Sequence, residues 1–89
     1  SPSATYRVQI QVEALDRKGL LSDLIRAISE SGVNILDARV HTSEDRTVVD
    51  RFALELGDRF MLEHVLNVVR NVTGVYKAYR LTGAKPSEA

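Results

Sequence analysis

The 89-residue sequence predicts an α+β fold in which two helices cover one face of a four-stranded antiparallel sheet. Three observations predict it. Residues 6–14 alternate apolar and polar side chains without interruption, as in a strand with one buried face. Segments 20–30 and 58–71 repeat apolar residues at intervals of three and four, which is typical of helices with one apolar stripe. Three further strands are predicted at 33–42, 47–56 and 75–81.

The first strand and the first helix are the most regular segments. The strand's apolar face consists of Tyr6, Val8, Ile10, Val12 and Ala14. The helix's apolar stripe consists of Leu20, Leu21, Leu24, Ile25 and Ile28. Gly32 follows this helix and suits the left-handed position just beyond a helix end.

Residues 33–56 are predicted to form a hairpin. The apolar side chains change parity at Ile35 and Leu36, which predicts a bulge or an irregular entry into the strand. Asp50 interrupts the inward face of the second arm, which is otherwise apolar. That face consists of Val48, Phe52, Leu54 and Leu56. Asp58 is the expected N-cap of the second helix, which should end near Asn71 with Gly74 just beyond.

The order strand, helix, strand, strand, helix, strand, with right-handed crossovers, gives a ferredoxin-like sandwich with strand order 4-1-3-2. The uncovered face of the sheet is expected to be hydrophilic and of mixed sign. We place the domain at residues 6–82, with residues 1–5 a linker or cloning remnant and residues 83–89 a flexible polar tail.

The bulk composition excludes several classes of function. Twelve basic residues balance twelve acidic ones, so the chain has no overall charge for nucleic acid or an anionic membrane. No segment approaches the length of a membrane span, and no signal-peptide pattern opens the chain. There is no cysteine, which excludes disulfides and thiolate metal sites. We expect a cytoplasmic protein.

No catalytic constellation is evident. His41 and His64 are far apart in the sequence, without acidic residues at metal-ligand spacing, so we expect no metal, no cofactor and no catalytic residue. Acylphosphatases share this element order and use an arginine and an asparagine. Arg17 and Asn34 offer such a pair only superficially, because the first loop lacks a glycine-rich phosphate cradle.

RNA binding is a second use of this topology. RNA-recognition modules present aromatic residues on the two central strands, whereas the corresponding faces here carry arginine, glutamine and glutamate. Binding of that kind is not expected. A minor contribution from basic side chains stays open. These are Arg39, Arg51, Lys77 and Arg80.

The loop Asp16-Arg17-Lys18-Gly19 precedes the first helix and could bind a small ligand. Backbone N–H groups of Gly19, Leu20 and Leu21 lack intrahelical partners and would meet a carboxylate, while Asp16 would meet an ammonium group. Together these suit a zwitterionic amino acid. The alternative is a solvated turn in which Gly19 only helps the chain to bend, and the residues alone favour this alternative.

Two segments resemble the signature of ACT domains: Asp16-Arg17-Lys18-Gly19-Leu20-Leu21, and Gly32-Val33-Asn34-Ile35 after the first helix. The runs 8–17 and 72–75 are most similar to the C-terminal ACT domain of RelA/SpoT-type bifunctional (p)ppGpp synthetase/hydrolases, the enzymes of the stringent response. The βαββαβ order covers residues 6–81.

This resemblance implies a regulatory domain of a larger enzyme that binds an amino-acid effector. ACT domains often form homodimers side by side, here through strand 2 and helix 1, with the effector between the first loop of one subunit and the start of strand 2 of the other. Carried over to this sequence, the loop side consists of Asp16, Lys18, Gly19, Leu20 and Leu21. The facing side consists of Asn34 and Ile35.

Leu21 and Ile35 would present apolar surface to the effector, which favours a branched-chain amino acid such as valine. Arg17 and Lys18 can extend to solvent or to another domain and receive less weight. The alternative function is a ligand-free module that docks on the catalytic region of the parent enzyme or on the ribosome. Asp50 and the parity shift near Ile35 leave the sheet edge, and with it the dimer-interface site, open.

Overall fold

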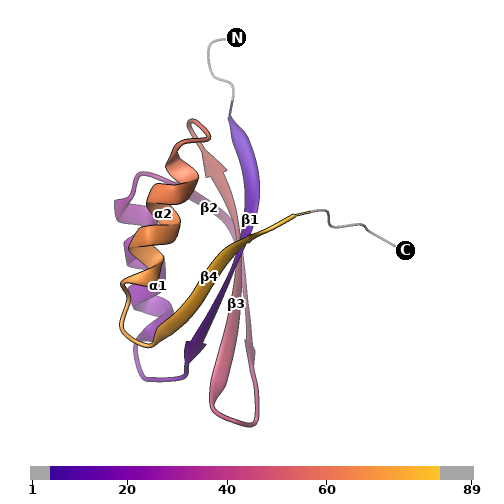
Figure 1. Cartoon of the computed structure of the whole chain (residues 1–89), viewed down its shortest axis with the longest axis vertical. Coiled ribbons are helices and arrows are strands. Elements are labelled where there is room, and N and C mark those ends of the chain that lie inside the picture. The colour runs from indigo at the N-terminus through magenta and orange to yellow at the C-terminus, as the bar shows by residue number, and fades with distance from the viewer. Residues whose placement is uncertain (1–4, 83–89) are drawn as a thin grey trace, which may run out of the picture.

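The computed structural model describes residues 5–82, so the predictions for residues 1–4 and 83–89 lie outside the described residues. The six elements are β1 (Tyr6–Leu15), α1 (Leu20–Glu30), β2 (Asn34–Thr42), β3 (Thr47–Leu56), α2 (Met61–Arg70) and β4 (Val75–Leu81). The antiparallel sheet has the order β2-β3-β1-β4, and both helices cover one face (Figure 1). The predicted ferredoxin-like fold is therefore confirmed.

β1 is a central strand that pairs with β3 on one side and β4 on the other. Its alternation buries Val8, Ile10, Val12 and Ala14 under the helices. Tyr6 was predicted on the same face but is 44% exposed. It is the first residue of the strand and pairs with Leu56, the last residue of β3, so it lies at the end of the sheet.

The first helix buries a narrower stripe than predicted. α1 buries Leu20, Leu24 and Ile28, whereas Leu21 and Ile25 are 39% and 38% exposed. A fully buried leucine or isoleucine contributes about 1.5–3 kcal/mol to folding, so the three buried residues hold α1 on the sheet. The flank with Leu21 and Ile25 is left partly open to solvent. α2 buries Val65, Leu66 and Val69.

The helix boundaries confirm one prediction and correct another. Gly32 has φ 85°, the left-handed conformation expected beyond α1. Asp58, in contrast, is not the N-cap of α2, which begins at Met61 with Phe60 in the capping position. The Asp58 carboxylate instead accepts the N–H of Phe60 at 2.8 Å, which forms a local turn before the helix.

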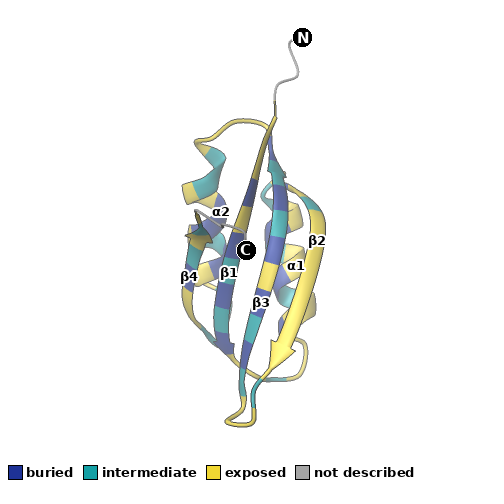
Figure 2. Ribbon diagram, turned by 90° about the vertical axis from the view of Figure 1, so that its right-hand side faces the viewer, coloured by how far each residue is buried: buried dark blue, intermediate teal, exposed yellow. Residues whose placement is uncertain are grey.

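β2 is an edge strand and pairs only with β3 within residues 5–82. Its register shifts between Ile35 and Asp37, which confirms the irregularity predicted from the parity change and leaves Leu36 unpaired. Every residue of β2 except Ile35 is exposed, and Figure 2 shows the strand in yellow along almost its full length. The sheet thus has one long edge with open backbone groups.

The uncovered face of the sheet is polar, as predicted. The Gln11 amide donates to Tyr79 Oη at 2.6 Å, and the Tyr79 hydroxyl donates to Glu13 Oε2 at 2.6 Å. Arg51 Nη2 donates to Gln11 Oε1 at 3.0 Å. The aromatic ring on this face is therefore tied to a carboxylate. Neither helix of residues 5–82 has the length and apolar character needed to cross a membrane.

Candidate functional site

The loop between β1 and α1 is held by backbone hydrogen bonds to two other turns. The N–H of Leu15 donates to Gly74 O at 2.9 Å, in the α2–β4 turn. The N–H of Asp16 donates to Arg46 O at 2.8 Å, in the β2–β3 turn. The loop therefore lies where three connections of the fold meet, at one end of the sheet.

Gly19 is the N-cap of α1 and has φ 83°. A Cβ at this position would meet only Arg17 Nη1, at 3.8 Å, so space is available for a side chain. The left-handed backbone is what favours glycine, because another residue costs about 1–2 kcal/mol there. The positive φ of Gly19 is therefore a conformational reason for glycine at this position.

The first turn of α1 offers backbone donors. The N–H of Leu20 already donates to Arg17 O at 3.2 Å, so it is less available than predicted. Within residues 5–82, no hydrogen bond uses the N–H groups of Gly19 or Leu21. The helix dipole makes this end positive, which suits a carboxylate.

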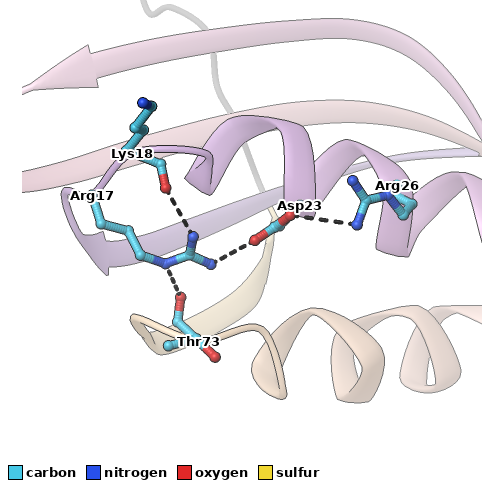
Figure 3. A network of polar contacts seen from close by, with 5 residues as sticks. All are labelled: Arg17, Lys18, Asp23, Arg26 and Thr73. Carbon is cyan, nitrogen blue, oxygen red and sulfur yellow. Dashed lines mark hydrogen bonds and ion pairs between the residues drawn. The ribbon is translucent and has the colours of Figure 1, made fainter.

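Arg17 folds back over the loop and does not extend to solvent (Figure 3). Its Nε donates to Thr73 O at 2.8 Å and its Nη1 to Lys18 O at 3.1 Å. Its Nη2 lies 2.8 Å from Asp23 Oδ2, and Arg26 Nη1 lies 3.5 Å from Asp23 Oδ1. Sequence reasoning missed this cluster, which ties the loop to α1 and to the α2–β4 turn.

Asn34 and Ile35 lie at the far end of α1 from the loop. The exposed Asn34 amide donates to Glu55 Oε1 at 3.4 Å, and the half-buried Ile35 packs against the core. α1 has 11 residues, so it separates these two residues from Gly19 by roughly 16 Å. One chain therefore does not bring the two halves of the predicted site together. The same separation parts Arg17 from Asn34, so the acylphosphatase-like pair does not form.

An exposed apolar strip runs between α1 and the edge strand. We define it as Leu21, Ile25 and Val40, which are 39%, 38% and 48% exposed. The opposite flank of α1 contains Asp23, which Arg17 ties to the α2–β4 turn, so Leu21 and Ile25 lie on the flank toward β2. Val40 pairs with Asp50, whose side chain lies on the helix-covered face. The strip is continuous with the loop end of α1.

Asp50 lies beside this strip and is only 1% exposed. Its Oδ1 has no hydrogen-bond partner within residues 5–82. Burial raises the pKa of the Asp50 carboxyl to about 6, and the negative charge of Asp16 adds to the rise. Sequence reasoning noted Asp50 only as an interruption of the apolar face. A charged residue at an inward strand position was the available signal.

A hollow of about 670 Å³ lies at the opposite end of the sheet and was also missed. Its lining includes Tyr6 and Phe60, of which Phe60 is 80% exposed. It also includes Arg7, Arg59 and Arg80, and none of these forms an ion pair within the described residues. The hollow is cationic and partly aromatic.

The two histidines lie on different elements of the fold. His41 and His64 are both exposed and lie on β2 and α2. No group of three or more histidine, aspartate or glutamate side chains in residues 5–82 could hold a metal ion.

Comparison with known proteins decides the family. The family model described as ACT domain matches residues 2–80, which is most of the chain. The chain belongs to the ACT domain family. The loop before α1 and the start of β2, which carry the resemblance in the sequence, both lie within the match.

The relatives of this ACT domain are much longer proteins. It is 57% identical over 84 residues to the bifunctional (p)ppGpp synthase/hydrolase RelA of Mycobacterium tuberculosis, covering 94% of this chain and 11% of that protein. It is 54% identical over 83 residues to the GTP pyrophosphokinase of Streptomyces coelicolor, covering 93% of this chain and 10% of that protein. The chain thus spans about a tenth of the length of these relatives. The predicted similarity to the alarmone enzymes is confirmed.

Solved structures show the same fold. The crystal structure of the ACT domain from the GTP pyrophosphokinase of Chlorobium tepidum has a TM-score of 0.77 at 19% identity, covering 88% of this chain and 100% of that chain. The acetolactate synthase small subunit from Thermotoga maritima has a TM-score of 0.72 at 16% identity, covering 84% of this chain and 47% of that chain. At these identities the likeness concerns the fold.

Proposed function

We propose that this ACT domain regulates a larger (p)ppGpp synthetase/hydrolase by binding an amino acid, with valine or another branched-chain amino acid favoured. The similarity to RelA and GTP pyrophosphokinase supports the parent activity. The observation that supports the effector is the combination at the start of α1: backbone N–H groups of Gly19 and Leu21 that no acceptor in residues 5–82 uses, beside the exposed side chain of Leu21. These would bind the carboxylate and the aliphatic side chain respectively.

The complete site would need a second copy of the chain. β2 runs from Asn34 toward the hairpin turn, so it ends near the loop that contains Gly19 (Figure 1). If two copies pair their β2 edges antiparallel, the start of one β2 lies beside the end of the other. The Asn34 and Ile35 of one copy would then face the Gly19 loop of its neighbour. The roughly 16 Å separation within one chain is thereby overcome.

The exposed apolar strip supports both the dimer and the choice of effector. Leu21, Ile25 and Val40 would be covered by the second copy or by an aliphatic ligand, which removes apolar surface from water. The strip contains no charged side chain, so an acidic effector is not favoured. The effector would control the parent enzyme only if it binds one of its states more tightly than the other.

The second candidate function is ligand-free docking onto the catalytic region or the ribosome. The cationic hollow with Tyr6 and Phe60 favours it, because a largely exposed phenylalanine beside three arginines that form no ion pair within residues 5–82 suits contact with an anionic partner. The two functions use opposite ends of the sheet, so they can be tested separately.

The test is a titration of the ¹⁵N-labelled chain with valine, isoleucine, leucine, serine and glutamate. Saturable amide shifts at Gly19, Leu21 and Asn34 with an aliphatic amino acid, and none with glutamate, are the expected result. The absence of shifts with every amino acid at millimolar concentration would reject the sensor. Pull-downs with the catalytic region and with ribosomes, using Phe60→Ser as the variant, would then test docking.

A further inference from the structure

Asp50 is a buried acid that the proposed function does not yet use. It follows the alternation of β3, so its side chain lies on the same helix-covered face as Val48 and Phe52. It is 1% exposed, and no ion pair in the described part of the chain includes it. A buried carboxylate without a partner costs stability, because the charged form loses its hydration and gains nothing in exchange.

Within residues 5–82, the residues that flank Asp50 across the sheet carry no positive charge. On its two neighbouring strands it pairs with Val12 and Val40. Arg17 is already bound to Asp23 and to Thr73 O. Asp16 is close enough for its negative charge to raise the pKa of Asp50 further. Asp50 and Asp16 therefore place negative charge in one small region. A single positive group bound there would offset the charge of both carboxylates.

This region adjoins the proposed effector site. Val40, the cross-strand neighbour of Asp50, is 48% exposed and belongs to the apolar strip with Leu21. Asp50 is the fourth residue of β3. The start of this strand lies beside the loop before α1, because the N–H of Asp16 donates to Arg46 O in the turn that precedes β3. α1 covers this half of the sheet (Figure 2). The Asp50 carboxylate, the apolar strip and the N–H groups of Gly19 and Leu21, which no acceptor in residues 5–82 uses, thus occupy the same end of the described domain.

We propose that Asp50 is the group that receives the α-ammonium of the amino-acid effector, and this rests on the proposed function. The first turn of α1 then binds the effector carboxylate, and the apolar strip binds its side chain. Asp16, which the sequence assigned to the ammonium, is exposed, so solvent screens its charge more than that of the buried Asp50. The site accordingly selects zwitterionic amino acids over aliphatic acids of the same shape, because only the former neutralise the buried carboxylate.

The test compares three probes by calorimetry on this chain: valine, 3-methylbutanoate, which lacks the amine, and isobutylamine, which lacks the carboxylate. We expect valine to bind at least about tenfold more tightly than 3-methylbutanoate, because one hydrogen bond to a buried charged group is worth about that factor or more. This comparison needs no substitution, so it does not depend on the folding of a variant.

Asp50→Asn has nearly the same shape and removes the charge. We expect it to weaken valine binding about 10- to 100-fold and to leave 3-methylbutanoate binding unchanged. Asp58→Asn is the matched control, since it removes one carboxylate at the opposite end of the sheet while an asparagine can keep the turn. It should bind valine like the unsubstituted chain.

The outcomes separate the two proposals. Tight valine binding that neither Asp50→Asn nor loss of the ligand amine weakens would overturn the role of Asp50 and leave the effector site standing. If no amino acid binds the unsubstituted chain, both proposals fail. If Asp50→Asn does not fold, Asp50→Ser replaces it, and the comparison of valine with 3-methylbutanoate still decides.

Discussion

The guanidinium of Arg17 lies 2.8 Å from the carboxylate of Asp23, and the same side chain donates to Thr73 O at 2.8 Å. One residue thus joins the loop before α1, the first turn of α1 and the α2–β4 turn (Figure 3). The loop cannot move without disturbing these contacts. Arg17 therefore anchors the loop to α1 and to the α2–β4 turn.

Replacement of Arg17 by lysine should lower the free energy of unfolding by roughly 1 kcal/mol. Lysine keeps the charge but lacks the planar fork that serves Thr73 O, Lys18 O and Asp23 together. The ion pair is about one third exposed, so its own contribution is small, and most of the loss comes from the bonds to carbonyl groups. Urea unfolding measures the effect. Arg26→Lys is the matched control, because Arg26 makes only the longer of the two contacts to Asp23, at 3.5 Å. It should lower the free energy of unfolding by much less. Equal losses for the two variants would contradict the role assigned to Arg17.

Replacement of Gly19 by alanine should cost about 1–2 kcal/mol, because alanine is strained at φ 83° although its Cβ meets nothing closer than 3.8 Å. Gly57→Ala is the matched control, since Gly57 also has open space and is not among the residues with positive φ. Thermal unfolding of both variants checks the prediction. A Gly19→Ala variant as stable as Gly57→Ala would show that the backbone at Gly19 relaxes without cost.

The stability of the chain should depend on the protonation of Asp50. Its pKa is raised from 3.8 to about 6 in the folded chain, so folding favours the protonated form. The stabilisation from this pKa shift is complete below pH 3.8 and is lost as pH rises through about 6. It amounts to roughly 3 kcal/mol in the free energy of unfolding, at 1.36 kcal/mol per pKa unit. Urea unfolding across this range should show the loss in the unsubstituted chain and not in Asp50→Asn.

The quantity to measure is the difference in the free energy of unfolding between the unsubstituted chain and Asp50→Asn. Other acids change the stability with pH in the opposite direction, and this difference removes their effect. The hydroxyl of Tyr79 lowers the pKa of Glu13, so the contribution of Glu13 is present at neutral pH and is lost on acidification. Glu13 is unchanged in the Asp50→Asn variant, and its effect cancels in the difference. Parallel pH profiles for the two chains would contradict the assignment to Asp50.

Local patterns in the sequence were sufficient for the fold. The alternation in β1 and the parity change at Ile35 each report a single strand, and the strand order follows from connection rules. The flank of α1 was harder to predict, because a stripe that includes Leu21 and Ile25 does not reveal how far the sheet extends beneath the helix. Leu21 and Ile25 are exposed because β2 is the edge strand on that side of the sheet.

The candidate site was predicted only in part. The sequence predicted a site that combines the loop with the start of β2, but one chain keeps these two segments apart, so their meeting would depend on a second copy of the chain. The bond from Arg17 to Thr73 O joins residues 56 positions apart, and no local pattern specifies such a contact. The missing partner of Asp50 is likewise a property of the packed chain, since it requires knowing every polar group around it.

Replacement of Val40 by lysine should prevent pairing of two β2 edges and, with it, effector binding. Val40 is 48% exposed, so the change should leave the stability of a single chain within about 0.5 kcal/mol. In a paired sheet, each lysine would lie against the edge strand of the other copy and within the apolar strip, which is unfavourable because the charge loses its hydration. Sedimentation measures the assembly, and the valine titration measures binding.

Tyr76→Lys is the matched control, because Tyr76 is 57% exposed on β4, the other edge of the same sheet. A dimer that dissociates on Tyr76→Lys and persists on Val40→Lys would place the interface on β4, which would leave the loop and Asn34 of two copies too far apart to share an effector.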